Sequence, residues 1–140
     1  FYANAVMSTN GSVWYCGGGQ PTFATGSLTL TPNHFGFLVI REAGAVNLKG
    51  TQADGSTNEQ TSALTTVATG NTVEVLAVLT AGASTKFYYS INGAAWSAGT
   101  TLSTNPPATG NTNNQTIYGA TNAGNVDAFS FKSAGASFYR

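Results

Sequence analysis

Short segments in which apolar and polar residues alternate recur along this chain, and no segment carries the 3.6-residue period of an amphipathic helix. The clearest alternation is NTVEVLAVLT, residues 71–80. One face of this predicted strand holds Val73, Val75, Ala77 and Leu79, and the other holds Glu74, Leu76 and Val78. Because successive side chains of a strand point to opposite faces, one row is expected to face a core.

The segment KFYYSI, residues 86–91, follows an AGAS turn and is predicted to pair with residues 73–80. We expect its inward row, Phe87, Tyr89 and Ile91, to lie opposite Val73, Val75 and Leu79. Asn92-Gly93 then ends the strand, since both residue types tolerate positive φ.

Other segments read as strands because of the same period, or because they are apolar on both faces. FGFLVIRE begins with Phe35, Phe37 and Val39 on one side and then becomes apolar on both, which predicts a strand covered on both faces. The remaining predicted strands are SLTLT, VNLKG, SALTTV, TIYGAT and VDAFSFKS, the last with Phe129 and Phe131 on one face. TQADGSTNEQ, with Asp54-Gly55, reads as a turn-forming stretch, and TNPPATGNTNNQ as a polar loop.

These segments amount to roughly nine or ten short strands separated by Gly, Asn and Pro, a pattern typical of an all-β sandwich or barrel. The 140 residues suit one domain, so we assign 1–140 to a single β-sandwich domain. The chain starts at Phe1 without Met, and we interpret it as a fragment or the ordered part of a longer chain.

Charged residues make up only 7% of the chain, against about 25% in a typical soluble domain, and the formal net charge is zero. The five Lys and Arg residues are scattered, so no nucleic-acid partner is expected. No apolar run reaches about 18 residues, and we predict no membrane span. A neutral surface rich in hydroxyl and amide groups favours association and suits a protein fixed in an assembly or displayed outside a cell.

Cysteine occurs once, at Cys16, which excludes an internal disulfide. We interpret Cys16 as a small buried residue, with an intermolecular bridge or a catalytic thiol as alternatives. A catalytic thiol needs a base, and nothing in the sequence links Cys16 to His34, the only histidine. His34, in TPNHFG, is interpreted equally well as a loop residue, and one histidine makes no zinc site.

The second half of the chain resembles a known family. VEVLAVLTAGASTKFYYSINGAAWSAGTTLSTNPP and TIYGATNAGNVDAFSFKSAGASFYR are similar to the concanavalin-A-like jelly-roll domain of phage virion proteins, over about residues 35 to 140. The resemblance implies an antiparallel jelly-roll β-sandwich. It also implies a non-enzymatic structural protein of the virion surface, namely a capsid decoration protein, head fibre or tail-fibre domain. Its implied partners are copies of itself, as a trimer, other virion proteins and a host surface glycan.

Relatives of this fold class include glycosidases and calcium-binding lectins, so the acidic residues need attention. They are Glu42, Asp54, Glu59, Glu74 and Asp127. None forms the E-x-D-x-x-E spacing of the sandwich glucanases, and we predict no enzymatic activity and no cofactor. Asp54, Asn58 and Glu59 could form a weak oxygen-rich loop, but calcium normally needs several carboxylates, and we interpret the segment as a plain surface loop without metal.

The candidate contact residues are aromatic. Trp96 follows the Asn92-Gly93 turn, where it could pack at a sheet edge, anchor an interface or stack on a sugar ring. The full set of candidate interface or sugar-stacking residues is Trp96, Tyr118, Phe138 and Tyr139. A carbohydrate-binding, lectin-like module is the alternative function.

Overall fold

The computed structural model describes residues 13–19, 21–24, 27–80, 82–108 and 115–120, which form eleven β-strands and no helix. All the pairings between these strands are antiparallel. The fold is therefore all-β, as the sequence predicts.

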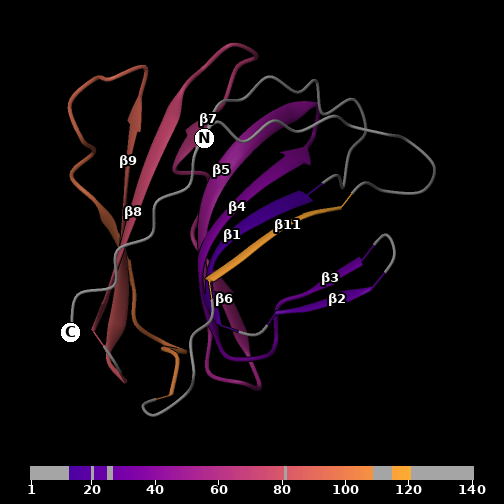
Figure 1. Cartoon of the computed structure of the whole chain (residues 1–140). Coiled ribbons are helices and arrows are strands. Elements are labelled where there is room, and N and C mark those ends of the chain that lie inside the picture. Colours follow the sequence, from indigo (N-terminus) through magenta and orange to yellow (C-terminus); the bar gives the residue numbers. More distant parts are fainter. Residues whose placement is uncertain (1–12, 20, 25–26, 81, 109–114, 121–140) are drawn as a thin grey trace.

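Two sheets lie against each other as the layers of a β-sandwich (Figure 1). The six-stranded sheet contains, in spatial order, β11 (Gln115–Ala120), β1 (Val13–Gly19), β4 (His34–Glu42), β5 (Ala45–Ala53) and β6 (Asn58–Gln60), with β7 (Thr65–Thr66) also paired to β5. The three-stranded sheet contains β10 (Thr100–Leu102), β9 (Ser84–Ile91) and β8 (Val73–Thr80). A separate hairpin consists of β2 (Thr22–Ala24) and β3 (Ser27–Thr29).

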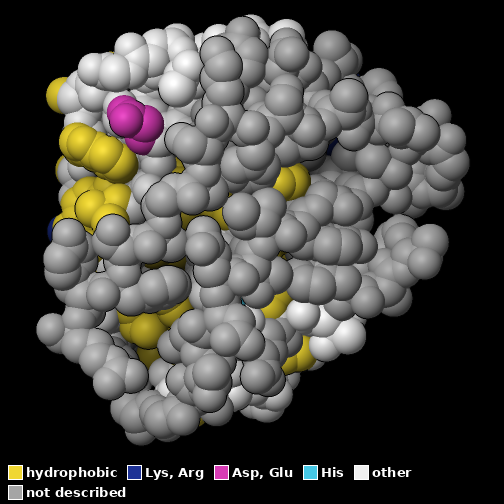
Figure 2. Space-filling model, viewed as in Figure 1, with side chains coloured by type: hydrophobic (Ala, Val, Ile, Leu, Met, Phe, Trp, Pro, Cys, Tyr) yellow, Lys and Arg dark blue, Asp and Glu magenta, His cyan; other side chains and the backbone are white. Residues whose placement is uncertain are grey.

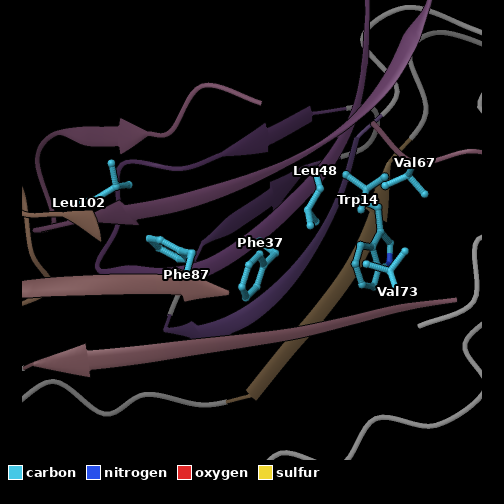
Figure 3. Close-up of a cluster of buried hydrophobic side chains, with 8 residues drawn as sticks. Trp14, Phe37, Leu48, Val67, Val73, Phe87 and Leu102 are labelled. Atoms are coloured by element: carbon cyan, nitrogen blue, oxygen red, sulfur yellow. The ribbon is translucent and has the colours of Figure 1, made fainter. Parts of the chain in front are cut away.

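The hydrophobic core fills the space between the two sheets (Figure 3). The buried cluster contains Trp14, Phe37, Val39, Leu48, Val67, Val73, Phe87 and Leu102. Phe37 of β4 and Phe87 of β9 meet edge to face, with ring centroids 5.3 Å apart. Aromatic pairs favour this geometry because the positive ring edge meets the negative ring face.

The alternation predicted for β8 and β9 is confirmed. Along β8 the predicted inner row is buried or half-buried, and the predicted outer row is exposed. Phe87 is fully buried, and Tyr89 and Ile91 pack against the core. One pairing was wrong: Phe87 lies opposite Ala77, whereas Leu79 lies opposite Thr85.

The turn after β9 also follows the prediction. Asn92 and Gly93 have φ angles of 54° and 74°, the left-handed conformation that these two residue types adopt most easily. The strand predicted at TIYGAT corresponds to β11, whereas VDAFSFKS lies outside the described residues.

The boundaries predicted between residues 51 and 67 were wrong. TQADGSTNEQ was predicted as a turn-forming stretch, but its first three residues end β5 and its last three form β6, leaving a short turn at 54–57. SALTTV was predicted as a strand, and the strand itself is only Thr65–Thr66, although the flanking amides of Leu64 and Val67 also donate to carbonyls of β5.

Candidate functional site

Trp96 lies between β9 and β10 with a relative exposure of 50%. The backbone around it is fixed by hydrogen bonds to β9. The amide of Ser97 donates to the carbonyl of Tyr89 at 2.9 Å, and the Ser97 hydroxyl accepts from the amide of Tyr89 at 3.1 Å. The hydroxyl of Ser90 donates to the carbonyl of Ala94 at 2.8 Å. The indole is therefore presented to solvent by an anchored segment.

Of the other predicted contact residues, Tyr118 lies within the described part of the chain, and it is on a different sheet from the one beside Trp96. Tyr118 lies on β11, where it is paired in register with Tyr15 of β1. This places Tyr118 on the six-stranded sheet, whereas Trp96 adjoins the three-stranded sheet. Phe138 and Tyr139 lie outside the described residues.

The outward face of the three-stranded sheet carries an apolar area that the sequence analysis did not single out as a contact surface. We call this face the outer-sheet surface. The residues that alternation and register assign to it are Glu74, Leu76, Val78, Thr80, Ser84, Lys86, Tyr88, Ser90 and Thr101. Of these, Ser90 is itself buried, with its hydroxyl bonded to the carbonyl of Ala94. Leu76 and Val78 are each 48% exposed. Figure 2, viewed as Figure 1, shows hydrophobic side chains gathered beside an acidic one on the side of the molecule where β8 and β9 lie.

His34 was interpreted equally well as a loop residue, but it is the first residue of β4 and is fully buried. Its Nδ1 lies 2.8 Å from the carbonyl oxygen of Pro32, which can only accept, so Nδ1 carries the proton. Nε2 is then the acceptor for the Thr51 hydroxyl at 3.0 Å, and the Asn58 amide donates to the same hydroxyl oxygen at 2.8 Å. Burial lowers the pKa of His34, and the bond to Pro32 offsets only part of that effect. The ring is therefore a neutral structural group.

Cys16 and His34 lie on opposite faces of the six-stranded sheet. Cys16 is opposite Phe37 on β4, so its side chain shares the face of the core. His34 is three residues from Phe37, so its ring points to the other face, where it contacts Tyr15 with centroids 5.7 Å apart. Burial raises the pKa of the Cys16 thiol to about 12. The two residues therefore cannot form a nucleophile and base pair.

Three of the four acidic side chains in the described ranges bind neighbouring groups of their own sheet or turn. Glu42 forms an ion pair with Lys49, with 2.7 Å between Oε2 and Nζ. Asp54 Oδ1 accepts hydrogen bonds from two backbone amides of its own turn. Glu59 Oε2 accepts from the Gln52 side chain and from two backbone amides after β10. Among the described residues no three His, Cys, Asp or Glu side chains are grouped as a metal site would require.

The same described ranges contain no helix of the length and apolarity needed to cross a membrane. Comparison of the chain with protein-family models, with curated proteins and with solved structures finds no match.

Proposed function

We propose that this chain is a non-enzymatic structural module of a virus particle, displayed on the outside as a capsid decoration protein, head fibre or tail-fibre domain. It acts through protein–protein contacts. The observation that carries the proposal is the outer-sheet surface, where two aliphatic side chains are about half exposed on a regular, hydrogen-bonded sheet. An apolar area on a rigid surface is a typical contact site, because covering it costs little conformational entropy and removes apolar area from water.

The chemistry of the described side chains supports a binding role over a catalytic one. Cys16 and His34 are separated by the sheet, and the bound carboxylates hold turns and loops. The low charge of the whole chain supports association, since little electrostatic repulsion opposes it.

The virion setting, the jelly-roll order of the strands and the trimeric state rest on the resemblance of residues 35 to 140 to phage virion proteins. In this proposal the partners are copies of the chain and other virion proteins, and the location is the virion surface.

The location is tested with antibodies raised against the recombinant chain. Purified particles of the virus that encodes it should be labelled on their outside in immunogold electron microscopy. The matched control is the same antibody after absorption with the free chain. Labelling confined to the soluble fraction of the infected cell would contradict the proposal.

The second candidate function is carbohydrate binding, and the exposed, anchored indole of Trp96 favours it. Aromatic faces stack on the apolar faces of sugar rings, and the hydrogen bonds of Ser97 and Ser90 keep the backbone at Trp96 in place. A glycan array tests this function, with Trp96→Ala as the variant. Saturable binding that Trp96→Ala removes would favour the lectin-like role.

A further inference from the structure

On the outer-sheet surface an acidic residue and a basic residue lie on either side of an apolar pair, and the polar pair Thr80–Ser84 lies beyond the basic residue. Three cross-strand pairs follow one another along it: Glu74–Ser90, Leu76–Tyr88 and Val78–Lys86. Successive pairs on one face are about 7 Å apart along the strands. Glu74 and Lys86 are therefore separated by the pair that contains Leu76.

The two charges do not neutralise each other within one chain. The ion pair between Lys49 and Glu42 lies on the other sheet. The Nζ of Lys86 instead lies 5.1 Å from the ring centroid of Tyr88. The ammonium group is thus held over the middle of the surface by a cation–π contact, and Glu74 is exposed.

We infer that two copies of this chain pack face to face through their outer-sheet surfaces, related by a two-fold axis. Each Glu74 then faces the Lys86 of the second copy. A two-fold axis midway between two groups exchanges them, so a surface with an acid on one side of the axis and a base on the other is complementary to itself. The same packing covers Leu76 and Val78, the two large aliphatic side chains that are exposed among the described residues.

The charge balance of the chain supports a second copy as the occupant. The formal net charge is zero, so two copies meet without long-range repulsion. The surface holds one acid and one base. A partner with a strong charge of one sign would leave one of these two groups without an opposite charge. Because the apolar part of the contact is small, with Leu76 and Val78 as its exposed aliphatic side chains, we expect a dissociation constant in the micromolar range.

This inference rests on the proposed function, because it names a partner for the outer-sheet surface on which that proposal depends. It differs in symmetry from the trimer implied by the resemblance, because a closed ring of three pairs two different patches, whereas a two-fold contact pairs one patch with itself.

Sedimentation of the full chain at micromolar concentrations tests the contact. The wild-type chain should reach twice its 14.3-kDa mass as concentration rises. Glu74→Lys sets lysine against lysine at both ends, and Lys86→Glu sets glutamate against glutamate. Each single change should weaken association by about tenfold or more.

Mixing the two single variants gives the sharpest result. A chain with two lysines on the surface then meets a chain with two glutamates, so a mixed pair should form with about the wild-type affinity. The double variant Glu74→Lys/Lys86→Glu should also regain self-association. Such recovery would not follow if either change merely damaged the fold.

Matched controls keep the result interpretable. Ser62→Lys and Ala63→Glu each add one charge, of the same sign as the change in the corresponding test variant and half its size, at exposed positions between β6 and β7, and should leave association unchanged. Leu76→Glu should abolish it, with an unchanged circular dichroism spectrum. A wild-type chain that stays monomeric, a trimer, or a dimer that survives both single charge changes would overturn the two-fold contact. None of these outcomes bears on whether antibodies label the outside of virus particles.

Discussion

Phe87 packs the two sheets against each other. Its side chain is fully buried, and its ring contacts Phe37 edge to face. Opposite the ring lies Gly50 of β5, where an added Cβ would come within 2.6 Å of the ring carbons. Real side chains do not approach that closely, so the glycine at position 50 gives Phe87 the room that it occupies.

Truncation of this side chain should be among the most damaging single changes in the chain. Phe87→Ala should lower the free energy of unfolding by about 3 to 5 kcal/mol, because it removes a buried aromatic and leaves a cavity. Tyr88→Ala is the matched control: its ring faces outward, and its loss should cost about 1 kcal/mol or less. Urea titration measures both. A loss under about 1 kcal/mol for Phe87→Ala would contradict the described packing.

His34 makes folding sensitive to mild acid. Its partners are hydroxyl, amide and carbonyl groups, and the titratable ring beside it, Tyr15, has a pKa that burial raises further above its usual range. The unfolded chain therefore takes up a proton at His34 near pH 6.5, whereas the native ring resists it. Since the unfolded state then binds more protons, stability falls as pH drops below about 6.5 and levels off below the folded pKa.

The expected slope is at most about 1.4 kcal/mol per pH unit, the value for one proton. His34 is the only histidine, so His34→Gln should flatten the dependence between pH 7 and pH 5, whatever it does to stability at pH 7. Urea titrations at several pH values in this range measure the slope. The same slope in wild type and His34→Gln would show that another group is responsible.

At the level of elements, the sequence predicted strands best where one face is buried and the other is exposed to solvent. In β8 and β9 the alternation identified both the strands and their inner rows, because a shift of one residue would have exposed the core row. The single wrong pairing, of Leu79, arose because alternation defines a face but not the register between two strands.

The polar ends of β5 and β6 show why the same reasoning failed at residues 51–60. Thr51 and Gln52 are fully buried, yet both are polar and were read as part of a turn. Thr51 is bonded to Asn58 across the two strands, and Gln52 donates to Glu59 at 2.8 Å. Polar residues can thus lie inside a sheet when most of their polar atoms are hydrogen-bonded to one another, although the Oε1 of Gln52 has no partner. A pattern of hydrophobicity contains no sign of these bonds.

Glu59 links β6 to the segment after β10, and its charge should stabilise that link. Burial raises the pKa of Glu59, but the hydrogen bonds from Gln52, Asn105 and Thr104 outweigh burial, so its pKa lies below the usual value. Glu59→Gln should cost about 1 kcal/mol at neutral pH, after allowance for partial exposure. The carboxylate contributes above about pH 4.5, and this contribution is lost as pH falls through the folded pKa.

Urea titration of wild type and Glu59→Gln at pH 7 and pH 3.5 measures this difference, which should shrink in acid. Glu42→Gln is the matched control, because it removes a partly exposed ion pair with Lys49 and should cost no more than about 0.5 kcal/mol. Equal losses for the two variants at pH 7 would contradict a special role for Glu59.

For the whole molecule, the sequence predicted the all-β sandwich class but only part of the candidate site. Trp96 was identified because a tryptophan after a turn is conspicuous, and it is exposed as a contact residue requires. Leu76 and Val78 were correctly placed on the outer row of β8, but nothing in an alternating pattern tells which face of a sheet meets another protein. That information came from their exposure and from the positions of Glu74 and Lys86.

The distribution of acidic groups leads to a prediction about metals for the molecule as a whole. Glu42 pairs with a lysine, Asp54 caps its own turn, Glu59 binds backbone amides, and Glu74 stands on the outer-sheet surface. Calcium usually takes six to eight oxygen ligands, several of them carboxylates, and these groups are dispersed. We therefore expect EDTA to leave the thermal midpoint unchanged, as measured by circular dichroism with and without added calcium. A fall of several degrees that calcium reverses would contradict this expectation and would require ligands beyond the described residues, since a bound metal stabilises the native state by its binding free energy.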